Sequence, residues 1–204
     1  MNQAIKRGLI LGADGQHRCW WCGDDPLYVA YHDDEWGHQQ TDDIRLFEKM
    51  CLEGFQAGLS WITVLRKREN FRSAFDGFDF RKIATYDDKK VSELLKNEGI
   101  IRHEGKIRST INNAAKMLEL LSEFGSFINY LERFKPSKKS RPNDFSYETL
   151  SQITMSEESK ALSKDLKKRG FSFVGPTTMY AFMQAMGLVN DHVEGCFMRK
   201  SCGI

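Results

Sequence analysis

The chain has 204 residues, of which 41% are hydrophobic and 28% charged, as in an ordinary globular protein. Its formal net charge of +2 does not by itself indicate a nucleic-acid partner. No apolar run reaches the roughly eighteen residues that a membrane span needs, so we expect no contact with a membrane. The five cysteines are an odd number and widely spaced, which favours reduced thiols in a cytoplasmic protein over a disulfide framework.

The opening residues 1–17 contain only a very short apolar patch, too short for the core of a signal peptide, and we expect a flexible extension there. Residues 18–204 are predicted to form a single domain of two closely packed helical lobes. Helical periodicity with capping residues and terminal glycines dominates this part of the chain. It predicts helices at 41–54, 60–75, 87–99, 103–125, 156–170 and 176–187.

Strand patterns are nearly absent from the sequence. The stretch LYVAY (27–31) is a weak strand candidate, and the proline-containing stretch 133–148 is predicted to be a surface loop. We therefore expect an all-α fold, a compact bundle of short helices.

Histidines and cysteines recur near both ends of the chain. His192 and Cys196 are four residues apart and would share one face of a helix. Cys19 and His32 near the other end could complete a Cys₂His₂ set, which suits a structural Zn²⁺ ion with no open position for water. Spacing alone leaves the alternative open that these are unrelated surface histidines and buried thiols.

Aromatic residues are concentrated between residues 20 and 61, together with several carboxylates. Such residues most often belong to a core, but Glu53 lies beside glycines at a predicted helix end and could face a cavity. The aromatic set that could line a site for a base comprises Trp20, Trp21, Tyr28, Tyr31, Trp36, Phe55 and Trp61.

The stretch RGFSFVGPTTMYAFMQAMG (169–187) predicts a tight turn between two helices. Backbone N–H groups around Gly175, Thr177 and Thr178 could bind a phosphate at the start of the second helix, with Lys164 and Lys168 on the first. A second stretch, LLKNEGIIRHEGKIRS (94–109), has a similar outline and competes for this role. Basic clusters of this kind are most often solvated helix faces.

Together these stretches resemble the DNA-3-methyladenine glycosylase I family, the bacterial zinc-containing branch of the helix-hairpin-helix glycosylases. The matching segments include DPLYVAYHDDEWG, CLEGFQAGLSWITVLRKRENFR, GIIRHEGKI, ALSKDLKKRGFSFVG and FMQAMGLVNDHVEGC, and span about nine-tenths of the chain. The resemblance implies the fold of those glycosylases and base excision repair by hydrolysis of the N-glycosidic bond of 3-methyladenine in double-stranded DNA. It also implies that one Zn²⁺ ion joins the two ends of the domain through Cys19, His32, His192 and Cys196.

The resemblance further implies a base pocket formed by Tyr28, Tyr31, Trp36, Glu53 and Trp61, with Trp21. Glu53 is expected to accept a hydrogen bond from the adenine, and its negative charge to favour a cationic base. Cys22 departs from the motif and could compete as a metal ligand. The resemblance gives Asp191 no role as a general base, and it leaves the attacking water unassisted.

No lysine stands out as a Schiff-base nucleophile, so we expect a monofunctional, monomeric enzyme that releases 3-methyladenine without cutting the strand. Two other classes remain open from the sequence. One is a non-catalytic, zinc-stabilised DNA-damage binding protein, and the other is a metallohydrolase with an open zinc site.

Overall fold

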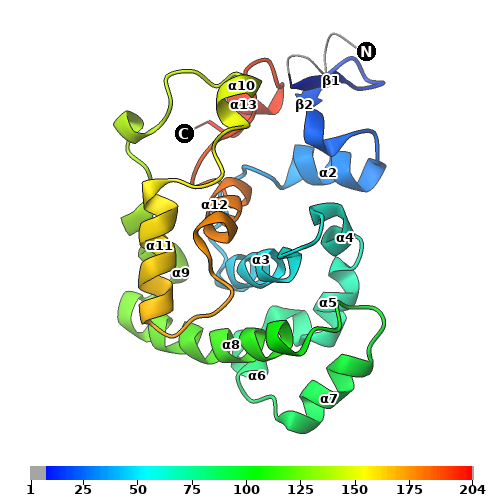
Figure 1. Ribbon diagram of the computed structural model, residues 1–204, viewed down its shortest axis with the longest axis vertical. Coiled ribbons are helices and arrows are strands. Elements are labelled where there is room, and N and C mark those ends of the chain that lie inside the picture. The colour runs from blue at the N-terminus through cyan, green and yellow to red at the C-terminus, as the bar shows by residue number, and fades with distance from the viewer. Residues whose placement is uncertain (1–7, 204) are drawn as a thin grey trace.

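The computed structural model describes residues 8–203, which form a mostly helical structure with one small sheet (Figure 1). Within residues 8–203, no helix combines the length and the apolar character that a membrane span requires. The elements in chain order are β1 (Leu9–Leu11), β2 (His17–Cys19), η1 (Trp20–Cys22), α2 (Pro26–Asp34), α3 (Asp43–Gln56), α4 (Trp61–Leu65), α5 (Arg68–Ala74), η2 (Asp76–Phe78), α6 (Phe80–Ile83), α7 (Asp88–Lys96), α8 (Glu104–Phe124), α9 (Phe127–Leu131), η3 (Glu132–Phe134), η4 (Lys138–Ser140), α10 (Tyr147–Leu150), α11 (Glu157–Lys168), α12 (Pro176–Ala185) and α13 (Met198–Ser201).

The helices predicted from periodicity are confirmed as α3, α7, α8, α11 and α12, and the helix predicted at 60–75 is divided into α4 and α5. Capping explains where several of them begin. The side chains of Asp42, Asp87 and Ser156 accept hydrogen bonds from backbone N–H groups in the first turns of α3, α7 and α11. These bonds satisfy donors that have no partner within the helix.

The structure corrects the strand prediction. LYVAY lies in helix α2, because Asp25 caps its first turn and Pro26 occupies a position where a helix tolerates proline. The sheet lies earlier in the chain, where β1 and β2 pair antiparallel with Leu9 opposite Cys19. From residue 8 onward, the predicted flexible extension is therefore held in a β-hairpin, whereas residues 1–7 lie outside the described part.

Helix α3 lies at the centre of the fold and packs against α4, α8, α9 and α12 (Figure 1). Most of the largest fully buried side chains are phenylalanines, including Phe47, Phe55, Phe71, Phe75, Phe78, Phe80, Phe127 and Phe182. Large rings contribute most of the apolar area that a helical core buries. This core fixes α3, whose other side faces the candidate site.

The two ends of the described chain lie close together. The β-hairpin and α13 are neighbours at the top of Figure 1, and the backbone N–H of Phe197 donates to the carbonyl of His17 at 2.9 Å. Residues more than 170 positions apart can therefore contribute to one site.

Candidate active site and metal-binding group

Helix α2 contributes side chains to two neighbouring sites. Tyr28 and Tyr31 are three residues apart and lie on one side of the helix, whereas His32 projects from an adjacent position. Tyr31 and His32 are both buried. The cap at Asp25 fixes the start of α2 and hence the direction in which all three side chains point.

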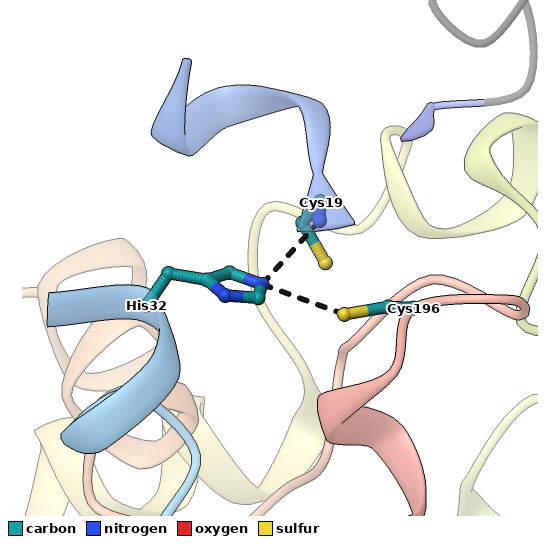
Figure 2. A group of neighbouring side chains, drawn as sticks. All are labelled: Cys19, His32 and Cys196. Atoms are coloured by element: carbon teal, nitrogen blue, oxygen red, sulfur yellow. Dashed lines mark hydrogen bonds between the residues drawn. The ribbon is translucent and has the colours of Figure 1, made fainter. Parts of the chain in front are cut away.

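Three possible metal ligands from distant parts of the chain meet beside α2 (Figure 2). The ligand atoms of Cys19, His32 and Cys196 all lie within 4.8 Å of one another, and all three residues are buried. The Nε2 atom of His32 lies 3.5 Å from Sγ of Cys196 and 3.3 Å from the backbone nitrogen of Cys19. Two sulfurs and an imidazole nitrogen at these separations could hold a metal ion.

His192 lies beside this group, not within it. Its ring centroid is 5.1 Å from that of His32, and its Nδ1 atom is 3.1 Å from Oδ1 of Asn190. Its Nε2 atom is buried and has no hydrogen-bond partner among the described residues. Burial lowers the pKa of His192 to about 3, so the imidazole is neutral and an unprotonated Nε2 is free to bind a ligand.

The expectation that His192 and Cys196 share a helix face is wrong. The chain from Asn190 to Cys196 is irregular, with a turn at Gly195 (φ +95°), and α13 begins only at Met198. This positive φ favours glycine and reverses the chain direction. The turn, not a helix, brings Cys196 toward His32.

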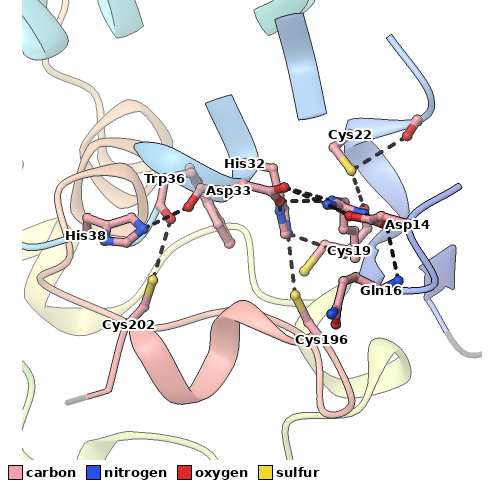
Figure 3. Close-up of polar contacts among 12 residues, drawn as sticks. Asp14, Gln16, Cys19, Cys22, His32, Asp33, Trp36, His38, Cys196 and Cys202 are labelled. Atoms are coloured by element: carbon pink, nitrogen blue, oxygen red, sulfur yellow. Dashed lines mark hydrogen bonds and ion pairs between the residues drawn. The ribbon is translucent and has the colours of Figure 1, made fainter. Parts of the chain in front are cut away.

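The second nitrogen of His32 is held by a half-buried ion pair (Figure 3). Nδ1 of His32 lies 2.7 Å from Oδ1 of Asp33, and Arg18 donates to Asp33 at 2.7 and 3.0 Å. Burial raises the pKa of Asp33, but the hydrogen bonds from Arg18 and His32 outweigh it and keep the pKa below its ordinary value. A carboxylate that orients an imidazole in this way is typical of metal-binding histidines.

Cys22 does not join the group. Its Sγ donates to the carbonyl of Cys19 at 3.1 Å, and burial raises the pKa of the Cys22 thiol to about 12. Cys202 likewise lies apart, with its Sγ 3.9 Å from the carbonyl of Trp36 (Figure 3).

All six residues predicted for a base pocket line one cavity of about 200 Å³: Trp21, Tyr28, Tyr31, Trp36, Glu53 and Trp61. The rings pack in mutually tilted pairs, with centroids 4.9 Å apart for Trp21 and Trp36 and 5.3 Å apart for Tyr31 and Trp61. Trp20, from the wider aromatic set, also lines the cavity, and residues that were not predicted for it complete the lining: Gln56, Leu150, Ala181, Gln184 and Asp191.

The cavity and the metal-binding group share a wall. The ring of Trp36 lies 4.6 Å from that of His192, and the ring of Trp21 lies 5.2 Å from that of His32, centroid to centroid. Both tryptophans therefore touch the imidazoles on one side and line the cavity on the other.

Glu53 is buried and paired with a lysine from its own helix. Its Oε1 lies 2.7 Å from Nζ of Lys49, one turn earlier on α3, and both side chains are more than 90% buried. Burial lowers the pKa of Lys49, and the Glu53 carboxylate acts against this shift. The carboxylate expected to face a base thus already has a counter-charge.

Lys49 belongs to a second cavity of about 200 Å³ on the other side of Tyr31 and Trp61, which line both cavities. Its lining is mostly polar or charged: Asp34, Glu35, His38, Gln39, Gln40, Arg45, Glu48, Arg68 and Arg72, besides Leu52 and Met186. Most of these charges are paired, as between Arg68 and Glu35 at 2.6 Å.

Asp191 reaches the edge of the base cavity but is fully engaged. It accepts hydrogen bonds from Tyr180 at 2.7 Å, from Gln184 at 2.8 Å and from Arg141. All three donors come from side chains of the protein, so the carboxylate is engaged at the edge of the cavity.

The predicted turn between two helices is present between α11 and α12. Phe173 has a positive φ of 56°, and Gly175 is the N-cap residue of α12, in extended backbone. Ser163 on α11 donates to the carbonyl of Val174 at 2.6 Å and fixes the turn. Lys164, Lys168 and Thr177 are exposed, and Gly175 and Thr178 half-exposed.

The competing stretch lies against this turn. The ring of His103, just before α8, is 6.2 Å from that of Phe173. Nearby, Lys106 is buried and donates to the carbonyls of Phe55 and Ala57 at 2.9 and 2.7 Å, where α3 ends. Residues 94–109 thus support the C-terminal end of α3 and the α11–α12 turn.

Comparison with known proteins shows the family to which the chain belongs. A model of the methyladenine glycosylase family matches residues 21–200. The DNA-3-methyladenine glycosylase 1 of Escherichia coli K12 is 52% identical over 88% of this chain and 95% of its own, and the Haemophilus influenzae DNA-3-methyladenine glycosylase is 48% identical over 90% and 98%. A solved structure of a single-residue variant of 3-methyladenine DNA glycosylase I in complex with 3-methyladenine superposes with a TM-score of 0.83, at 32% identity over 89% of this chain and 97% of that one. The chain belongs to the methyladenine glycosylase family.

Proposed function

We propose that this protein is a DNA-3-methyladenine glycosylase, which hydrolyses the N-glycosidic bond of 3-methyladenine in alkylated DNA and releases the free base. The observation that carries the proposal is the cavity walled by tryptophans and tyrosines with the buried carboxylate of Glu53, in a chain 52% identical to the Escherichia coli enzyme over 180 residues.

The chemistry of the lesion fits such a cavity. Methylation at N3 makes the adenine cationic and weakens its bond to the sugar, so the base leaves as neutral 3-methyladenine with little need for a general acid. Extruding a base from the duplex costs a few kcal/mol, and less for a damaged base. Stacking on aromatic side chains contributes about 1–3 kcal/mol per base and offsets much of this cost.

Glu53 is proposed to accept a hydrogen bond from the exocyclic amine or ring edge of the adenine. A guanine would place a carbonyl against this carboxylate, which disfavours it. The ion pair with Lys49 changes one expectation: the carboxylate does not act as an unbalanced negative charge toward a cationic base.

The attacking water is proposed to act without a dedicated base, and Asp191 is engaged by three donors. Lys49 is the lysine nearest to Glu53 in this site, but it is bonded to Glu53 and Tyr31 and lines the neighbouring cavity. We therefore propose a monofunctional reaction without strand cleavage.

The α11–α12 turn is proposed to grip the DNA backbone in the manner of a helix-hairpin-helix motif. The N–H groups that follow Gly175, with Thr177 and Thr178, would bind a phosphate, and Lys164 and Lys168 would add positive charge. The exposure of Lys164, Lys168 and Thr177 supports this role.

One structural Zn²⁺ ion is proposed to bind Cys19, His32, His192 and Cys196. The buried Nε2 of His192, which has no hydrogen-bond partner among the described residues, supports this fourth ligand. Asp33 and Asn190 support the site as well, because each lies within hydrogen-bond distance of the Nδ1 atom of one imidazole. The ion would cross-link the N-terminal hairpin to the C-terminal segment and take no part in the reaction.

The proposal is tested by incubating the protein with methylated duplex DNA and identifying the released bases by chromatography. We expect 3-methyladenine and no strand nicks. Binding of lesion DNA without release would instead indicate a non-catalytic damage-binding protein, and nicked strands would contradict the monofunctional reaction.

A further inference from the structure

Lys49 occupies a position that the proposed reaction does not yet explain. Its Nζ lies 2.7 Å from Oε1 of Glu53, 2.7 Å from the hydroxyl of Tyr31 and 3.2 Å from the ring centroid of Trp61. All three partners line the base cavity, whereas Lys49 lines the cavity behind them. The ammonium group thus lies behind the wall that a base would contact.

These contacts favour the charged form of the lysine. A carboxylate at hydrogen-bond distance and an aromatic face both stabilise a cation, and they act against the burial that lowers the pKa of Lys49. Since Glu53 and Lys49 carry opposite charges, the net charge at this wall is zero.

The charge matters because the base changes charge during the reaction. The adenine is cationic while bound to the sugar and becomes neutral as the bond breaks, and its positive charge passes to the sugar. An unbalanced carboxylate would hold the starting cation more tightly than the departing base, and only interactions that strengthen toward the transition state accelerate a reaction.

We propose that Lys49 is a positioning and specificity-determining residue, which holds Glu53 in place and cancels its charge, so that the pocket selects 3-methyladenine by its hydrogen-bonding edge and not by its positive charge. This inference rests on the proposed function, because it assumes that the base binds beside Glu53.

Two small ligands that share the methylated adenine ring but differ in charge can distinguish recognition by charge from recognition by the hydrogen-bonding edge. 3-Methyladenine is neutral, whereas 3,9-dimethyladeninium carries a methyl group in place of the sugar and stays cationic. Their dissociation constants are measured by calorimetry with the wild-type protein and the Lys49→Met variant. We expect K49M to raise the affinity for the cation relative to the neutral base by about tenfold.

Three further variants make the test specific. In Glu53→Gln, the lysine charge is unbalanced, so the affinity for the cation relative to the neutral base should fall about tenfold. Lys49→Arg keeps the charge and should return the ratio to within about threefold of wild type. Lys106→Met removes another buried lysine, one that donates to the carbonyls of Phe55 and Ala57, and should leave the ratio unchanged even if both affinities fall.

Equal losses of affinity for both ligands in K49M would show that Lys49 only supports the structure. Unchanged affinities for both ligands would show that the lysine charge does not influence binding. Either result overturns the inference. If K49M does not fold, the opposite shift in E53Q decides the question. Failure of the wild-type protein to bind 3-methyladenine would instead contradict the proposed function itself.

Discussion

The base cavity and the metal-binding group are built from neighbouring residues but by different means. Tyr31 and His32 are adjacent on α2, and one lines the cavity whereas the other belongs to the Cys19–His32–Cys196 group. The six predicted pocket residues come from a continuous stretch, residues 21–61, on neighbouring helices and, for Trp36, on the turn after α2. The metal-binding group joins residues 177 positions apart, from Cys19 to Cys196.

This difference predicts which change affects stability and which affects recognition. The metal-binding group ties together the two ends of the described chain, so its loss should mainly lower stability. The cavity is held by α2, α3 and α4 against the phenylalanine core, so changes to its polar residues should mainly alter base binding.

The largest expected effect comes from breaking the metal-binding group. Structural zinc contributes on the order of 10 kcal/mol in small domains, and we expect Cys196→Ala to lower the free energy of unfolding by several kcal/mol. Chelation of the wild-type protein should have a similar effect in urea unfolding. Cys22→Ala is the matched control, because this buried thiol lies outside the group. Equal losses in the two variants, or a purified protein without metal, would contradict the zinc proposal.

Trp36 tests the wall that the two sites share. Trp36→Ala should reduce the free energy of unfolding by ~3–5 kcal/mol, as for other buried rings, because Trp36 packs against His192. It should also weaken binding of 3-methyladenine, since the ring lines the cavity. Trp36→Phe keeps an aromatic face and should restore part of both properties. A change in stability without any change in base affinity would show that the two sites are independent.

Glu53→Gln should slow base release, and because it leaves the buried Lys49 without its counter-charge it should also lower the free energy of unfolding. A hydrogen bond to a charged group contributes ~1.5–3 kcal/mol, so we expect base release to be about 10- to 100-fold slower. Glu48→Gln is the control: Glu48 is also buried on α3, but it pairs with Arg72 and lines the second cavity. Equal slowing in both variants would indicate a general disturbance of α3.

The helices could be predicted from the sequence because they depend on local patterns, whereas the six residues expected to form the pocket followed from the resemblance to a known family. Capping residues at Asp42, Asp87 and Ser156 mark helix starts, and the aromatic density between residues 20 and 61 indicates a ring-lined site. The strand prediction is wrong because it weighs apolar content above a capping signal. The composition of LYVAY favours a strand, whereas Asp25 and Pro26 start a helix there.

What the sequence could not predict depends on long-range contacts. His192 and Cys196 fit a helix by spacing, but the turn at Gly195 is set by packing against the N-terminal hairpin, where a Cβ would lie 2.8 Å from Leu9. Lys49 was missed because lysines are rarely buried. Its i,i+4 spacing to Glu53 was visible, but only the fold shows that this face of α3 turns inward.

The smallest expected effect concerns the proposed DNA grip at the α11–α12 turn and the exposed lysines of α11. Each phosphate neutralised by a lysine contributes about 0.9 to the slope of log affinity against log salt, so Lys164→Met and Lys168→Met should each reduce the slope by up to about one. The affinity for DNA at moderate salt should fall only a few-fold in each variant, and the affinity for free 3-methyladenine should stay unchanged. Lys90→Met, on α7, is the matched control, since its ammonium lies 5.3 Å from the ring centroid of Tyr86, away from the α11–α12 turn. Equal slopes in all three variants would place the backbone contacts elsewhere on the protein.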